Sequence, residues 1–134
     1  HDVIPIINEN DVVADEEIKA HLALGDNDVL ASHVIRLVHA DLLILLTNSD
    51  GVRTPGRSGH TKRLSYIEEV NRKTLTVASS NKSRLSKGGM LTKLKAAQVA
   101  SRSGCSTVIA NGRETGILAR ILNGDDVGTI IPGS

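Results

Sequence analysis

Short aliphatic runs recur along the chain and predict the strands of a sheet. They lie at residues 3–7, 41–47, 106–110 and 128–131. The second run, DLLILLT, is apolar almost throughout, which is typical of a parallel strand that is buried on both faces. We therefore expect residues 41–47 to form the central strand of the sheet.

Between these runs, apolar residues recur at the spacing of a helix. One helix is predicted to begin at an N-cap residue, Asp26 or Asn27, and to run to His39. A second helix is predicted over residues 90–103, and a shorter third over residues 115–122. Strands that alternate with helices predict an α/β fold, with a mostly parallel sheet and helices on both of its faces.

Three segments carry a weaker pattern. Residues 11–24 are predicted to be a loop or a hairpin. Residues 48–63 hold three glycines and one proline, and are predicted to be a long surface loop. Residues 65–71 are predicted to form a short helix. Within the helix over residues 90–103, Gln98 falls beside the apolar stripe and makes that face imperfect.

The composition limits the class of protein. The 134 residues fit one domain, whose core must be aliphatic because the chain has one tyrosine and neither Phe nor Trp. The lack of aromatic platforms and the net charge of +1 argue against a nucleic-acid partner and against a membrane surface. No apolar run approaches the roughly 20 residues that span a bilayer, so we expect a cytoplasmic protein. The single cysteine, Cys105, excludes an internal disulfide and is expected to be a small core residue.

The chain begins at His1 and enters a strand-like run almost at once. A sheet core that opens so abruptly, without an initiator methionine, leads us to expect one domain over residues 1–134 from which an N-terminal half is missing. Acidic residues crowd the first third of the chain and basic residues crowd its middle. An acidic edge that faces a basic edge suits a site for metal and polyphosphate, although solvated faces of an ordinary domain are at least as common.

Polar clusters follow the predicted strands, at the place where ligands bind in open α/β sheets. The first cluster spans residues 8–11 and the second spans residues 47–51. The third, KGG at residues 87–89, precedes a helix with Lys93 near its start. Glycine amides at a helix N-terminus favour a phosphate, and a lysine close by can reach it. A glycine pair before a helix is also an ordinary loop, and on spacing alone the two interpretations are about even.

Lys93 stands at an unfavourable place for a cation, because the positive end of the helix dipole lies there. An anion should compensate, and a phosphate held by the Gly88 and Gly89 amides is the expected one. Lys95 lies two residues further on, and we expect it to be a solvated surface lysine.

The fourth cluster, GDND at residues 25–28, places two carboxylates and an amide at a helix start. Asp26 or Asn27 taken singly is better explained as a helix cap. Together with Asp11, the cluster would form an acidic pocket that could hold an amino group, Mg²⁺ or catalytic lysines. We expect Asp11, Asn27 and Asp28 to converge in space.

Taken together, these motifs resemble those of a known family in their order and approximate spacing. The runs are IPIINEND at 4–11, GDND at 25–28, ADLLILLTNSDGV at 40–52, GGMLTKLKAAQVASRSG at 88–104, TVIANG at 107–112 and GTII at 128–131. They are similar to the glutamate 5-kinases of the amino acid kinase family, and the resemblance covers essentially the whole chain. Each motif alone is weak, but NEND followed by GDND and GGMxTK is highly specific.

The resemblance implies transfer of a phosphoryl group from ATP, with Mg²⁺, to the γ-carboxylate of L-glutamate, the first step toward proline. By motif, Asp11 and Asn27 would bind glutamate, Asp28 would orient the catalytic lysines, and Lys93 would stabilise the transferring phosphoryl group. The ATP-binding residues would be Thr47, Asn48, Lys87, Gly88, Gly89, Met90, Leu91, Thr92 and Lys93. No residue is assigned to a metal ion. We expect a homo-oligomer with no nucleic-acid or membrane partner.

The chain also departs from the family pattern. Asn48 stands where the family usually has Asp, and Ser86 and Lys87 stand where it usually has Gly-Thr. The segment over residues 18–25 is a few residues longer, and the family's N-terminal half, with a further phosphate-binding lysine, is not represented. Two alternatives stay open. One is another carboxylate kinase of the same fold, such as an acetylglutamate kinase, against which NEND and GDND argue. The other is a non-catalytic remnant that binds nucleotide.

Overall fold

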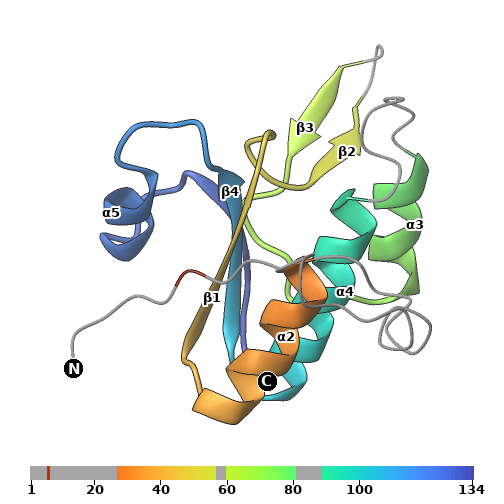
Figure 1. Cartoon of the computed structure of the whole chain (residues 1–134). Helices are drawn as coiled ribbons and strands as arrows, with labels where there is room; N and C mark the ends of the chain where they lie inside the picture. Colours follow the sequence, from red (N-terminus) through yellow and green to blue (C-terminus); the bar gives the residue numbers. More distant parts are fainter. Residues whose placement is uncertain (1–5, 7–26, 57–59, 81–88) are drawn as a thin grey trace, which may run out of the picture.

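The computed structural model describes residue 6 and residues 27–56, 60–80 and 89–134 (Figure 1). Its helices are α2 (Asn27–Val38), α3 (Arg72–Ser80), α4 (Gly89–Arg102) and α5 (Ile117–Leu122). Its strands are β1 (Leu42–Thr47), β2 (Arg53–Pro55), β3 (Thr61–Arg63), β4 (Ser106–Asn111) and β5 (Gly128–Ile131). The predicted segments over residues 3–7 and 11–24 lie outside this part, apart from Ile6, which belongs to no helix or strand.

The main sheet has the strand order β1-β4-β5. β1 and β4 are parallel and pair from Leu42↔Ser106 to Thr47↔Asn111, whereas β5 is antiparallel to β4. The α/β class is therefore confirmed, with a mixed sheet in the described part. The prediction that residues 41–47 form the central strand is wrong there, because β4 occupies the centre and β1 an edge.

Burial distinguishes the two apolar runs. Residues 107–110 of β4 are all buried, as expected of a strand covered on both faces. In β1, Leu43 and Leu45 are buried, whereas Leu46 is 46% exposed. The sequence pattern distinguishes apolar runs from polar ones, but it does not tell which run has neighbours on both edges.

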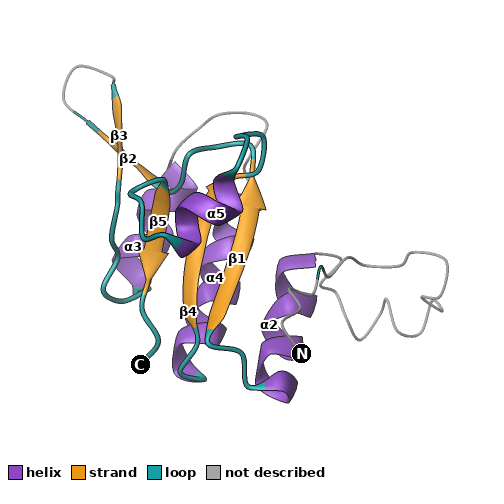
Figure 2. Cartoon of the chain, turned by 90° about the vertical axis from the view of Figure 1, so that its left-hand side faces the viewer, coloured by secondary structure: helices purple, strands orange, loops and turns teal. Residues whose placement is uncertain are grey.

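Helices cover the two faces of this sheet unequally. α2, α4 and α3 lie on one side and the short α5 on the other, as Figures 1 and 2 show from two directions. The larger core lies under α2 and α4 and contains Leu45, Leu94 and Ile109. Cys105 is also buried in it, as predicted, and burial raises the pKa of its thiol. A smaller core under α5 contains Val108 and Ile117, among others.

The segment predicted as a long surface loop contains regular structure. β2 and β3 form an antiparallel pair, with Arg53 opposite Arg63 and Pro55 opposite Thr61. The three-residue strands are too short to show a period in the sequence, and their glycines and proline dominate the pattern. The hairpin stands beside α3 at one end of the main sheet (Figure 1).

The predicted helix over residues 65–71 is also wrong. This segment instead starts by extending along β5, because the Ile130 amide donates to the Ser65 carbonyl and the Ile67 amide donates to the Ile130 carbonyl, both at 2.9 Å. The helix begins later, at α3, where the Asn71 side chain accepts a hydrogen bond from the Thr74 amide at 3.1 Å. That bond is the one an N-cap residue makes, so Asn71 sets the start of α3.

The longer helices follow the sequence closely. α2 and α4 begin and end within about a residue of their predicted bounds. Gln98, which interrupted the apolar stripe of α4, donates its side-chain amide to the Val70 carbonyl at 2.6 Å. Gln98 therefore joins α4 to the segment that precedes α3, which explains a polar residue beside the apolar stripe.

Candidate functional site

The carboxyl ends of the two parallel strands lie side by side. Thr47 ends β1 and is paired with Asn111 at the end of β4, and the Gly112 amide donates to the Thr47 carbonyl at 2.9 Å. Thr47 is half-buried, whereas Asn48 is exposed just beyond the strand. Both residues were predicted to contact a ligand, and both stand at the sheet edge where α/β proteins bind ligands.

Two helices begin at the same edge. α2 leads back to the start of β1 and α4 to the start of β4, so their N-termini lie toward the carboxyl ends of the strands (Figure 2). Helix N-termini carry unpaired amides and a positive dipole end, which together favour an anion. The edge therefore combines two strand ends with two helix N-termini.

An ion pair joins these two helix starts. The Lys93 ammonium lies 2.9 Å from Oδ1 and 2.7 Å from Oδ2 of Asp28. The side chains are 14% and 8% exposed, so water screens the pair little. Asp28 is the second residue of α2, where the helix dipole favours a carboxylate. The structure thus brings together two predicted site residues that are 65 positions apart in the chain.

Asp28 was expected to orient the catalytic lysines, and it contacts Lys93 here. Lys93 was also expected to have an anion beside it, and within the described residues that anion is the Asp28 carboxylate. A phosphate held by the Gly88 and Gly89 amides stays a prediction. Lys95 is exposed, as expected of a surface lysine.

Of the other residues predicted to bind a ligand, some are described by the structure and some are not. Gly89 is the exposed first residue of α4, and no described atom lies within 4 Å of the place a Cβ would take. Packing therefore does not require a glycine there. Met90, Leu91 and Thr92 are half-buried. Asp11, Lys87 and Gly88 lie outside the described residues, so the predicted convergence of Asp11 with Asn27 and Asp28 stays a prediction.

One polar contact beside Asn48 was not predicted. The Arg53 guanidinium donates to both carboxylate oxygens of Asp50 at 2.7 Å, and to the side chain and carbonyl of Thr61 at 2.8 and 2.9 Å. A planar guanidinium suits such forked contacts. Arg53 thus ties the turn that follows β1 to β3, and the only sequence signal was an Asp and an Arg three residues apart.

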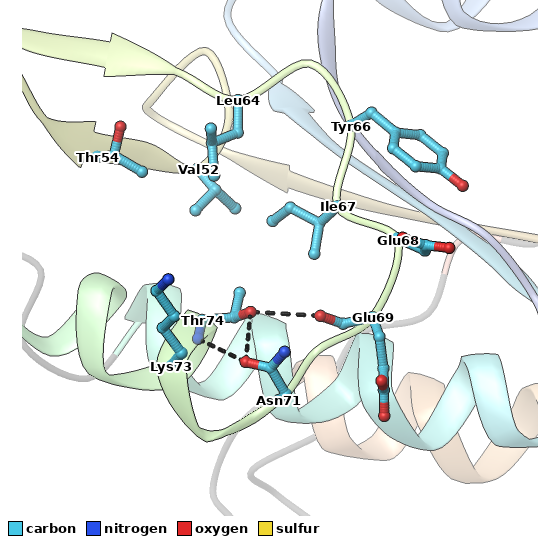
Figure 3. A pocket seen from close by; sticks show the side chains of 10 residues that line it. All are labelled: Val52, Thr54, Leu64, Tyr66, Ile67, Glu68, Glu69, Asn71, Lys73 and Thr74. Carbon is cyan, nitrogen blue, oxygen red and sulfur yellow. Dashed lines mark hydrogen bonds between the residues drawn. The ribbon is translucent and has the colours of Figure 1, made fainter.

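A pocket of about 600 Å³ lies between the hairpin segment and α3 (Figure 3). It is lined by Val52, Thr54, Leu64, Tyr66, Ile67, Glu68, Glu69, Asn71, Lys73 and Thr74. The Thr74 hydroxyl is hydrogen-bonded to the Glu69 carbonyl and to the Asn71 side chain, so these polar groups take part in the start of α3. No residue predicted from the sequence for ligand binding lines this pocket.

The described residues contain no group of three or more His, Cys, Asp or Glu side chains that could hold a metal ion. Among the same residues, no helix has both the length and the apolar character needed to cross a bilayer.

The chain is similar in sequence to known proteins of one family. The model of the amino acid kinase family matches residues 1–111. The chain is 47% identical over 131 residues to a glutamate 5-kinase of Azoarcus sp. (strain BH72), covering 96% of this chain and 34% of that protein. It is 42% identical over 132 residues to a glutamate 5-kinase of Clostridium acetobutylicum, covering 97% and 48%. The chain thus spans a third to a half of the length of these curated relatives.

Solved structures share the fold at lower identity. A carbamate kinase from Giardia lamblia bound to AMP-PNP superposes with a TM-score of 0.59 at 20% identity, over 80% of this chain and 32% of that one. A uridylate kinase from Archaeoglobus fulgidus superposes with a TM-score of 0.57 at 20% identity, over 79% and 46%. At this identity, the likeness shows the fold alone.

Proposed function

This chain belongs to the amino acid kinase family, and we propose that it forms the ATP-binding half of a glutamate 5-kinase. The reaction would move the γ-phosphoryl group of ATP to the γ-carboxylate of L-glutamate. The bond between the γ-phosphorus and the bridging oxygen breaks, a carboxylate oxygen bonds to that phosphorus, and ADP leaves. The product, glutamyl 5-phosphate, would feed proline biosynthesis. The 42–47% identity to proteins named glutamate 5-kinase supports this substrate over another carboxylate.

The observation that carries the proposal is the pair of Asp28 and Lys93 at two helix N-termini. Phosphoryl transfer needs positioning and neutralisation of charge more than covalent chemistry. Lys93 would neutralise charge on the transferring group. Asp28 would hold the ammonium in place while the helix amides receive phosphate oxygens. Because both side chains are nearly buried, these charges act with little screening.

The remaining residues take roles by motif. We propose that Thr47 and Asn48 contact the nucleotide and that residues 87–92 wrap its phosphates. Asp11 and Asn27 would bind the glutamate. Stabilising the charge on the transferring group requires cations on more than one side of it. We therefore propose that an N-terminal half of the domain completes the site. A cytoplasmic location and a homo-oligomer also stay predictions.

Mg²⁺ has no site of its own in the described residues. Both oxygens of Asp28 lie within hydrogen-bond distance of the Lys93 ammonium, and no acidic group of three is present in this part of the chain. In kinases the ion is often held mainly by the phosphates of the substrate. We propose that it arrives with ATP, and we assign it to no residue of this chain.

A second candidate is a protein that binds nucleotide without turnover. Two departures from the family pattern favour it. Asn48 stands where the glutamate 5-kinases usually carry an acid, and Ser86 and Lys87 stand where they usually carry Gly-Thr. The two candidates agree on ATP binding and differ only in glutamate-dependent turnover.

The test is a coupled assay of ADP release by the complete gene product that carries this chain, with and without L-glutamate. Lys93→Ala should lower turnover by roughly 100-fold or more, as the loss of a group that stabilises transition-state charge does. Lys95→Ala is the matched control and should stay within about twofold, because this exposed lysine lies two residues further along the same helix. Nucleotide binding without any glutamate-dependent turnover would favour the second candidate. Equal, small effects of the two substitutions in an active enzyme would contradict the role of Lys93.

A further inference from the structure

The Thr129 hydroxyl is one of the contacts that join the base of the hairpin to β5. Thr129 is fully buried, with 0% exposure. Its Oγ1 accepts a hydrogen bond from the Val52 amide at 2.8 Å and donates one to the Leu64 carbonyl at 2.6 Å. The Leu64 amide in turn donates to the Val52 carbonyl at 2.8 Å. The hydroxyl therefore bridges the two ends of the segment that contains β2 and β3.

The backbone approaches this hydroxyl as closely as glycine allows. Gly51 has φ +132°, a conformation that L side chains rarely adopt, and a Cβ there would lie 2.5 Å from Thr129 Oγ1. A side chain at position 51 would therefore clash with the Thr129 hydroxyl. Contact and hydrogen bond together fix the place of Val52 relative to the sheet.

Val52 ends the turn that begins at Thr47. The near end of this turn is held by the pairing of β1 with β4. Its far end is held by Thr129 through Val52, and on the surface by Arg53 through Asp50. We propose that Thr129 is a positioning residue for the nucleotide-binding turn of Thr47 and Asn48, although it touches neither residue in the contacts described above. This inference rests on the proposed function, since that function assigns ATP to the turn.

The neighbouring strand offers a matched control. Thr107 on β4 is also 0% exposed. Unlike the Thr129 hydroxyl, its Oγ1 has no hydrogen-bond partner within the described residues. Valine has nearly the shape of threonine without the hydroxyl. Thr107→Val therefore removes no described hydrogen bond. Thr129→Val removes two and leaves the Val52 amide unsatisfied, which is the costly outcome for a buried donor.

The experiment uses the complete gene product with Thr129→Val, Thr129→Ser and Thr107→Val. AMP-PNP binding is measured by calorimetry, and KM for each substrate and kcat are measured at a temperature well below each melting point. We expect Thr129→Val to weaken AMP-PNP binding and raise KM for ATP by about tenfold, the effect of losing a buried hydrogen bond or two. The value of kcat and KM for glutamate should change by less than twofold. Thr129→Ser keeps the hydroxyl and should restore binding, and Thr107→Val should bind as the wild type does.

Each other outcome has a clear meaning. If the wild type binds AMP-PNP and Thr129→Val binds it equally well, this inference is overturned and the proposed function is not. Equal changes in KM for ATP, KM for glutamate and kcat would reduce Thr129 to a stability role and overturn it too. A wild-type protein that does not bind AMP-PNP would overturn the proposed function and this inference with it. Should Thr129→Val not fold, Arg53→Gln loosens the same end of the turn from the surface. A severalfold weaker binding of AMP-PNP would then support the inference, and unchanged binding would contradict it.

Discussion

The ion pair of Asp28 and Lys93 makes a quantitative prediction about stability. At 2.7 Å the attraction of two unit charges is about 6 kcal/mol with an effective dielectric constant of about 20. Much of this is offset, because both groups give up water to become nearly buried. The net worth of the pair is therefore small, whereas the cost of removing one partner alone is large.

The two single substitutions should differ. Lys93→Met leaves the Asp28 carboxylate buried without its cation, which should lower the free energy of unfolding by about 3 kcal/mol. The α2 dipole favours this carboxylate and should reduce the cost by up to about 1 kcal/mol. Asp28→Asn should cost about 1–2 kcal/mol, because the long lysine side chain can turn its ammonium toward water. The double variant buries neither charge and should lie within about 1 kcal/mol of the wild type. With the double variant near the wild type, the magnitude of the coupling energy is then about 3–5 kcal/mol.

The assay is urea unfolding of the complete gene product and its three variants, completed as a double-mutant cycle. Lys95→Met is the control, and it should change stability by less than about 0.5 kcal/mol, because its side chain is exposed. Two single effects that add up in the double variant would refute the reasoning, since additivity means that the charges do not interact. So would a Lys93→Met variant as stable as the Lys95→Met control.

Two more predictions follow from the same structure. The isolated 134-residue chain should show no glutamate-dependent ATP turnover, because only one side of the γ-phosphoryl group is supplied with a cation, and robust turnover by purified chain would contradict this. At the base of the hairpin, the hydrogen bond from Arg63, and next the one from Ser65, lower the pKa of Asp126. The ionised carboxylate therefore stabilises the fold at pH values above its ordinary pKa. This contribution is lost as the pH falls through the lowered pKa. Asp126→Asn should therefore unfold at a lower temperature than the wild type at pH 7, and the gap should close on acidification below about pH 4; a gap independent of pH would contradict the role of the charge.

Much of this fold could be predicted from residue patterns alone. α2, α4 and three strands of the main sheet were found because each has the length and period of its element. The hairpin was missed for a different reason. Its base is held by contacts of Arg63 and Leu64 with residues 126–129, far along the chain, and no local pattern reports such contacts. The order of strands is likewise a property of the assembled sheet.

For the site, the motifs assigned roles to Asp28 and Lys93, and the resemblance implied that Asp28 orients the catalytic lysines. The structure adds the direct contact between the ammonium and the carboxylate, at 2.7 Å. The ligand-binding roles themselves stay predictions. Thr129 was missed altogether, because a buried threonine on a strand looks the same whether its hydroxyl is used or, as in Thr107, is not.

The contact between Asp28 and Lys93 depends on how closely their helices approach. α2 and α4 pack against each other, and several buried residues on them are small: Ala31 and Ser32 on α2, and Ala96, Ala97 and Ala100 on α4. Small side chains let two helix backbones come near, which brings groups near their N-termini within reach of each other. These alanines read as unremarkable core positions in the sequence. In the structure, they belong to one core cluster. The packing of α2 against α4 brings the Asp28 carboxylate and the Lys93 ammonium within hydrogen-bond distance at the edge where the strands end.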